Sequence, residues 1–139
     1  MFELQIYQQA ELIYYTDLHI EDPNYEIIRN QHRIQLCYGV SESTLAFIKK
    51  IHPDKKTQMK SFRTKEYQYN LLDTINGVRF ILLTSLLPEK QVDVAMKNLY
   101  DAYINYVKRN YMYKHGDIIR ISKFNAEVHK ILEDLKQAS

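Results

Sequence analysis

Residues 78–85 constrain the fold most strongly, because the four positions from Phe80 to Leu83 are all apolar. A strand with one face in water alternates apolar and polar residues, whereas a strand covered on both faces does not. Residues 67–73 predict a second strand. Asn76-Gly77, between the two, predicts a two-residue type I′ turn, since both residues accept positive φ angles. We therefore expect an antiparallel hairpin whose second strand is central in a sheet, with helices on both faces.

The remaining segments predict the rest of that sheet and its helices. Alternating apolar residues predict strands at residues 2–7 and 11–18, and a third at residues 57–64, whose Lys60 and Arg63 suit an exposed edge. Apolar residues at spacings of three and four predict helices at residues 24–52, at 88–110 with Pro88 as the first helical residue, and from Ser122 as N-cap. The order strand, strand, helix, three strands, helix, helix predicts a single α+β domain over residues 1–139.

Size and composition exclude several classes of protein. The chain has 139 residues, the size of one domain, and its 19 basic and 17 acidic residues leave a net charge of +2. The basic residues alternate with acidic ones, so the sequence predicts no nucleic-acid partner. Cys37 is the single cysteine, which rules out an internal disulfide and favours a reducing, cytoplasmic location. We expect neither a signal peptide nor a membrane-spanning segment.

The first predicted helix carries more apolar surface than one core requires. At about 100° per residue its apolar positions fill an arc of about 200°, and an arc of about 100° would serve a single core. Either a strongly twisted sheet and the flanking loops bury the whole arc, or its outer part binds a partner. We favour the second interpretation and include the neighbouring edge strand. The candidate interface residues are Leu36, Val40, Phe47, Ile51, Gln58, Lys60 and Phe62.

Other residue patterns do not indicate chemistry. Asp17 and His19 share a face of a predicted strand near Glu21 and Asp22, but a zinc site needs three or four converging ligands, and a solvated strand end is the better interpretation. Cys37 lies on the apolar arc without a neighbouring base, so we interpret it as a small buried hydrophobe. The three glycines are isolated, which excludes a phosphate-binding loop. We expect no catalytic residue, no metal and no cofactor.

Three segments of the chain contain motifs of a known family. They are Tyr38-Gly39 followed by Phe47, Lys50 and Pro53, then "FRTKEYQYNLLDTINGVRFILLT" from Phe62, and "LYDAYINYVKRN" from Leu99. Together they resemble the sybindin-like family, the small longin-like subunits of the TRAPP vesicle-tethering complex. The family pattern in the second segment is matched by Phe62, Thr64, Tyr67, Thr74, Gly77, Val78 and Arg79. The resemblance extends over about residues 34–135 and follows the same order of elements.

The resemblance implies both a fold and a function. The fold is longin-like (SNARE-like), a five-stranded antiparallel sheet with one helix on one face and two on the other. The implied role is that of a non-catalytic subunit, which pairs with other longin-like subunits and with the unrelated α/β subunits. The assembled complex tethers vesicles between the endoplasmic reticulum and the Golgi and acts as guanine-nucleotide exchange factor for a Rab GTPase. The chain would be cytoplasmic and peripheral to these membranes.

Some features depart from the family or leave alternatives open. The first hairpin has Gln9-Ala10 where the family often has an Asn-Gly turn, and Tyr111 stands where a Pro is usual. The first helix resembles the insertion-free small subunit, which we favour, while Tyr100 and Tyr103 resemble synbindin. A small chain of a clathrin-type adaptor is the alternative function. Basic residues at positions 49, 50, 55 and 56 form either a solvated face or a contact with an anionic membrane, worth about 1 kcal/mol per charge.

Overall fold

The computed structural model describes residues 2–18, 31–51, 59–63, 65, 67–74 and 77–137. Within these ranges, five strands form one sheet and three helices pack beside it. The strands are β1 (Glu3–Gln8), β2 (Glu11–Asp17), β3 (Met59–Arg63), β4 (Gln68–Asp73) and β5 (Val78–Thr84). The helices are α2 (Gln31–Ile51), α3 (Glu89–Tyr103), which continues as a π-helical turn η1 (Ile104–Lys108), and α4 (Ser122–Gln137).

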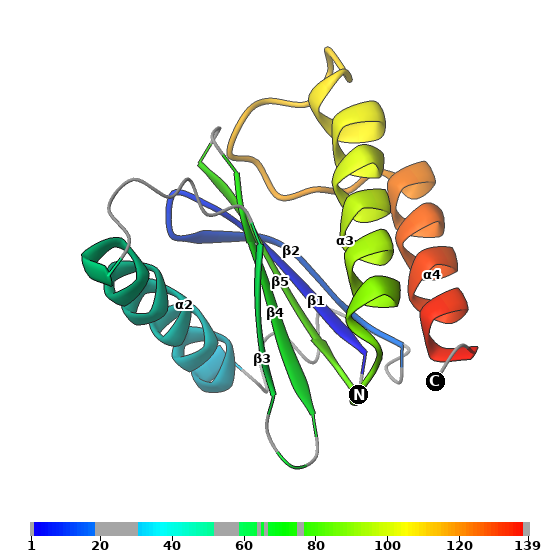
Figure 1. Cartoon of the computed structure of the whole chain (residues 1–139). Coiled ribbons are helices and arrows are strands. Elements are labelled where there is room, and N and C mark those ends of the chain that lie inside the picture. The colour runs from blue at the N-terminus through cyan, green and yellow to red at the C-terminus, as the bar shows by residue number, and fades with distance from the viewer. Residues whose placement is uncertain are drawn as a thin grey trace.

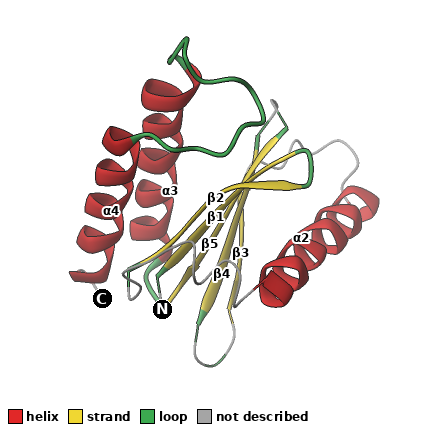
Figure 2. Cartoon of the chain, turned by 180° about the vertical axis from the view of Figure 1, so that it is seen from behind, coloured by secondary structure: helices red, strands yellow, loops and turns green. Residues whose placement is uncertain are grey.

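The strands lie in the order β2-β1-β5-β4-β3, and every neighbouring pair is antiparallel. Helix α2 covers one face of the sheet, and α3 and α4 lie side by side on the other (Figure 1; Figure 2 shows the same layers from behind). The predicted α+β class with an antiparallel sheet and three helices is confirmed. The central position predicted for the apolar strand is confirmed as well, because β5 is the middle strand of the five described.

Each face of β5 belongs to a different hydrophobic core. Phe80 and Leu82 are fully buried on the α3/α4 side, in the larger cluster. Ile81 and Leu83 point to the α2 side and join a smaller cluster that includes Leu45 of α2. Burial of such a side chain is worth roughly 1.5–3 kcal/mol. The absence of alternation in the sequence of β5 thus reflects the two layers of helices.

A buried polar network fixes the connection between β5 and α3. The side-chain amide of Asn70 donates to the carbonyl oxygen of Leu82 at 3.0 Å, and that of Gln68 donates to Oδ1 of Asn70 at 2.9 Å. The backbone amide of Leu87 donates to Gln68, and the carbonyl of Leu87 accepts from Arg63 at 2.7 Å. Buried polar groups need such partners to avoid a desolvation penalty. The network therefore holds the segment before α3 against strands β3 and β4.

The hairpin between β4 and β5 differs from the prediction. The amide of Gly77 donates to the carbonyl of Thr74 at 3.3 Å, and the amide of Thr74 donates to the carbonyl of Val78 at 3.0 Å. Three residues, not two, therefore separate the closing pair Thr74 and Val78, so the two-residue loop predicted at Asn76-Gly77 does not fit this pairing; Asn76 itself lies outside the described residues. Gly77 has φ +79°, a left-handed conformation that glycine adopts without strain.

Helix boundaries also differ from the predictions in detail. Pro88 has ψ 139°, which is not helical, so it precedes α3 as its cap and Glu89 is the first helical residue. The amide of Asn125 donates to the carbonyl of Ile121 at 3.0 Å, so Ile121 takes the cap position predicted for Ser122. The first predicted helix, residues 24–52, is observed as α2, and its positions 24–30 and 52 lie outside the described residues.

The turn between β1 and β2 is strained. Gln8 pairs with Glu11, and the two residues between them, Gln9 and Ala10, have φ 48° and 71°. A left-handed conformation costs a residue with a Cβ atom roughly 1–2 kcal/mol, a cost that glycine avoids.

We predict that Ala10→Gly stabilises the fold. The relieved left-handed strain exceeds the entropy that glycine adds to the unfolded chain, so the free energy of unfolding should rise by about 0.5–1 kcal/mol. Thermal and urea unfolding followed by circular dichroism measure this change. Gly77→Ala is the matched control, because Gly77 is also left-handed, and it should lower stability. A destabilised Ala10→Gly variant would show that the turn is not strained.

Candidate partner-binding surface

Helix α2 contacts the sheet through residues spaced three and four apart. Ser41 and Leu45 are buried, and Tyr38 is half-buried on the same side of the helix. The ring of Tyr38 lies 4.7 Å from that of Tyr7 on β1, measured between centroids. This side therefore faces the smaller of the two cores.

Arg79 of β5 joins the sheet to α2 through a set of polar contacts. Its Nε donates to Oδ1 of Asp73 on β4 at 3.3 Å, while one terminal nitrogen donates to Glu42 at 2.7 Å and to the Ser41 hydroxyl at 3.0 Å. Its guanidinium carbon lies 5.0 Å from the centre of the Tyr38 ring, within the range of a cation–π contact. Arg79 thus links three elements of the fold.

The electrostatics of this cluster keep Arg79 charged. Burial alone would lower the pKa of Arg79, but the hydrogen bond to Glu42 and the charge of Asp73 outweigh it, so the pKa is raised. Burial also raises the pKa of Tyr38, against the opposing charge of Arg79. Because the contacts with Ser41, Glu42 and Tyr38 come from one side of α2, they fix the rotation of the helix about its axis.

The opposite side of α2 presents apolar side chains to solvent. Val40 is 53% exposed and Phe47 is 64% exposed. The two residues are seven apart, so they share a face, which lies about 140° around the helix from the side of Ser41 and Leu45. The interpretation that the sheet and loops bury the whole apolar arc therefore fails for these two residues.

The other predicted interface residues are only partly described. Leu36 and Ile51 belong to α2, and Lys60 and Phe62 belong to β3, but the description of these four covers the backbone alone. Gln58 lies outside the described residues, as do positions 55 and 56 of the basic cluster. Strand β3 is the last in the order of the described sheet, which agrees with the edge position predicted for it.

The described residues contain no group of three or more His, Cys, Asp or Glu side chains that could hold a metal ion. Of the residues weighed for zinc, Asp17 ends β2, and His19, Glu21 and Asp22 lie outside the described ranges. Cys37 is described only as part of the α2 backbone. In the same part of the chain, no helix combines the length and the apolar character needed to cross a membrane.

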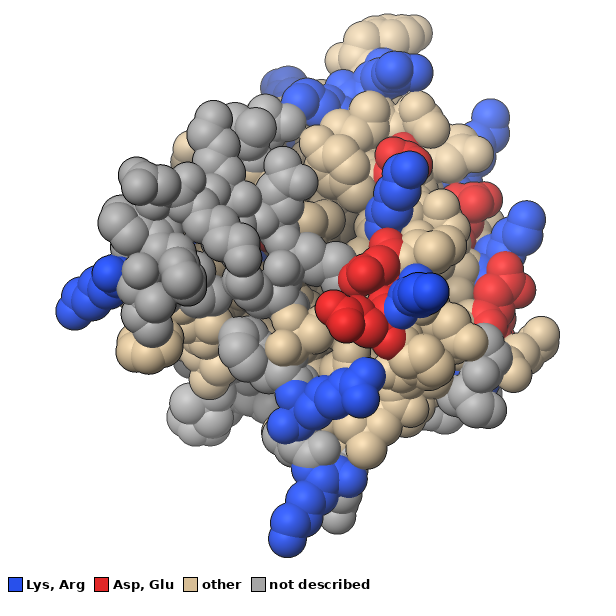
Figure 3. Space-filling view, viewed as in Figure 1, with Lys and Arg blue, Asp and Glu red and all other residues tan. Residues whose placement is uncertain are grey.

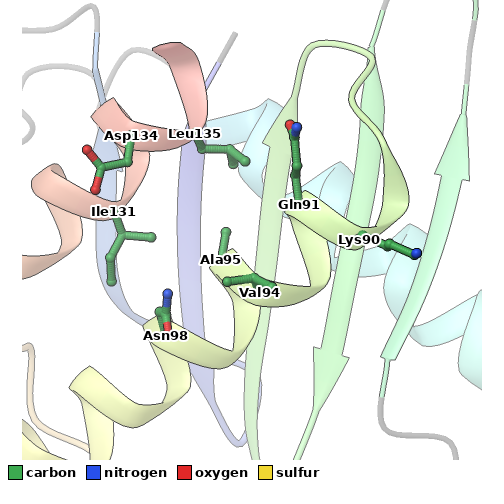
Figure 4. Close-up of a pocket in the computed structure, with 8 residues that line it drawn as sticks. All are labelled: Lys90, Gln91, Val94, Ala95, Asn98, Ile131, Asp134 and Leu135. Carbon is green, nitrogen blue, oxygen red and sulfur yellow. The ribbon is translucent and has the colours of Figure 1, made fainter. Parts of the chain in front are cut away.

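Two surface features were not predicted from the sequence. One is an open groove between α3 and α4, lined by Lys90, Gln91, Val94, Ala95, Asn98, Ile131, Asp134 and Leu135 (Figure 4). The other is the loop between η1 and α4, which exposes Tyr111, Met112 and Ile118. The helical spacing of α3 and α4 identifies their buried faces but not the groove left between them. The loop residues follow no regular period, so only their apolar character among basic residues could have indicated the exposed surface.

The model of the sybindin-like family matches residues 1–135, so the chain belongs to the sybindin-like family. It is similar to a protein of Dictyostelium discoideum named trafficking protein particle complex subunit 1. The two are 27% identical over 133 residues, which cover 91% of this chain and 89% of the relative.

We predict that Arg79→Ala loosens α2 without unfolding the α3/α4 side. The change removes the hydrogen bonds to Asp73, Glu42 and Ser41, but Glu42 is more than half exposed and can be rehydrated, so the free energy of unfolding should fall by about 2 kcal/mol. Relative to the unaltered chain, hydrogen exchange should show that the variant loses more protection in α2 than in α3. Arg79→Lys keeps the charge but lacks the planar guanidinium, so its protection of α2 should lie between that of the unaltered chain and that of Arg79→Ala. Unchanged protection of α2 would show that the apolar contacts alone hold this helix.

Proposed function

We propose that this protein is a non-catalytic subunit of the TRAPP complex, with a longin-like fold and an interface on the outer side of α2. The observation that carries the proposal is the exposed pair Val40 and Phe47 on a helix whose other side is fixed to the sheet. Membership of the sybindin-like family and similarity to a protein named as a TRAPP subunit support it.

The proposed interface combines an apolar helix face with an edge strand. Leu36 and Ile51 are each four residues from Val40 or Phe47, and this spacing would extend the face along α2. Strand β3 has one neighbour, β4, among the described strands, so its second edge can pair with another chain. Gln58, Lys60 and Phe62 are the residues proposed to contact a partner there. A second longin-like subunit, which has the same kind of face, suits this combination.

The function of the chain then lies in assembly. The complex would act as exchange factor for a Rab GTPase in transport between the endoplasmic reticulum and the Golgi, with the α/β subunits as further partners. The chain would contribute to nucleotide exchange only through its contact surfaces, since an exchange factor acts by binding its GTPase and opening it. The relative is matched nearly end to end, as expected for the insertion-free type of subunit.

The test is to express the tagged Phe47→Asp variant in the cells that naturally make this protein and to recover it with its partners. Burying an aspartate in place of phenylalanine should weaken partner binding by at least about 100-fold, because apolar burial is lost and an unpaired charge is desolvated. Native mass spectrometry of the purified material should then show the free chain, whereas the unaltered chain should be recovered with other TRAPP subunits.

Val94→Asp on α3 is the matched control, because Val94 is 61% exposed and lies on the other side of the sheet. This variant should keep its partners. Circular dichroism of both variants checks that they fold. Recovery of the Phe47→Asp variant with a full set of subunits would refute the proposed interface, and recovery of the unaltered chain with no TRAPP subunit would refute the proposed function.

A further inference from the structure

The loop between η1 and α4 exposes the most accessible large apolar side chains in the described part of the chain. Tyr111 is 93% exposed and Met112 is 76% exposed, and Ile118 in the same loop is 60% exposed. Figure 1 shows this loop beyond the yellow end of the α3 ribbon, at one end of the molecule. Exposed apolar side chains gathered in one place mark a contact surface.

The loop has a defined conformation that holds these side chains outward. The amide of Tyr113 donates to the carbonyl of Asn110 at 3.0 Å, and the Tyr113 hydroxyl donates to the carbonyl of Asp117 at 2.5 Å. The amide of Ile119 donates to the carbonyl of Ile13 on β2 at 2.8 Å, which fixes the end of the loop to the sheet. These hydrogen bonds therefore hold the backbone of the loop that carries the exposed tip, Tyr111 and Met112.

The segment that carries this tip is rich in positive charge. Residues 104–123 contain five basic residues and a single acidic one, Asp117, whereas the rest of the chain has 14 basic and 16 acidic residues. The basic residues are Lys108, Arg109, Lys114, Arg120 and Lys123, and all five are exposed. Figure 3 shows Lys and Arg side chains at the upper end of the molecule, where the loop lies; lower on the same face, further Lys and Arg side chains are mixed with acidic ones. The basic excess of the whole chain is thus concentrated here.

We propose that this loop binds the surface of an anionic membrane, with Tyr111 and Met112 entering the lipid interface and the five basic residues contacting the headgroups. Tyrosine favours the headgroup level, methionine adds apolar surface, and Lys and Arg are attracted to anionic lipid. A protein interface is usually depleted of Lys at its core, so lipid fits this composition better. Lipid also matches an apolar tip in a segment whose charged residues are nearly all basic.

This contact goes beyond the proposed assembly role and does not depend on it. The loop connects the two helical segments of the α3/α4 layer, and the proposed subunit interface lies on α2, across the sheet (Figures 1 and 2). Both surfaces can therefore be occupied together. Of the basic residues weighed from the sequence as a membrane contact, Lys49 and Lys50 belong to α2, across the sheet from this loop, and positions 55 and 56 lie outside the described residues.

The test uses the lack of tryptophan in the chain. Tyr111→Trp in the full chain gives a single fluorescent probe at the tip, and Val94→Trp, about 20 Å away along α3, gives a control at another exposed position. Vesicles of phosphatidylcholine with phosphatidylserine should shift the emission of the first variant to the blue. Lipids brominated in their chains should quench it. The control should show neither change.

Charge is tested by removing two loop residues from the basic set. Arg109→Gln with Lys114→Gln should weaken binding to these vesicles by about 30-fold, and high salt should weaken binding of the unaltered chain. Lys90→Gln with Lys97→Gln removes the same charge from α3 and should change binding less than about threefold.

The outcomes separate lipid from other partners. No blue shift with anionic vesicles, or equal binding to pure phosphatidylcholine, would overturn the proposal. A shift produced only by a purified partner subunit or by an oligonucleotide would overturn it in favour of that partner. Recovery of the loop variants with TRAPP subunits is measured in parallel, so failure of the membrane contact is distinguishable from failure of the assembly role.

Discussion

The structure depends on burying both faces of β5. Phe80 and Leu82 require cover on one face, and Ile81 and Leu83 require it on the other, so helices must lie on both sides of the sheet. A sheet with one face in water would leave two of these four apolar side chains exposed. Two helices cover one face and, among the described elements, one helix covers the other. This unequal division leaves the layer of α2 with less surrounding structure than the layer of α3 and α4.

The two layers are consequently held in different ways. The α3/α4 side is a large apolar core. The α2 side mixes a smaller apolar cluster with buried polar groups such as Glu3, which accepts a hydrogen bond from the Tyr15 hydroxyl, and with the Arg79 contacts. Polar contacts are directional, so they fix which side of α2 faces the sheet. They add little net stability compared with apolar burial, and a partner that covers Phe47 would stabilise this layer by binding the folded state.

The sequence predicted the class, the order of elements and the apolar arc of α2, because these follow from periodicity. It did not predict the β4–β5 turn, since the closing pair is set by hydrogen bonds between Thr74 and Val78 and not by the Asn-Gly pair alone. It also missed the loop surface. The end of the loop that carries Tyr111 is fixed by the hydrogen bond from Ile119 to Ile13, more than a hundred residues earlier, and no local pattern contains that contact.

The placement of the surfaces follows from the same constraint on β5. Covering one face with α2 leaves the outer side of that helix for a protein partner, and covering the other with two antiparallel helices requires a connection between them at one end. That connection carries the Tyr111 tip and most of the excess positive charge. A subunit built in this way can contact a neighbouring chain through α2 while its opposite layer presents the loop to an anionic surface. The apolar groups exposed at each place differ accordingly: Val40 and Phe47 lie seven residues apart on one side of the helix, and Tyr111 and Met112 lie in a hydrogen-bonded loop.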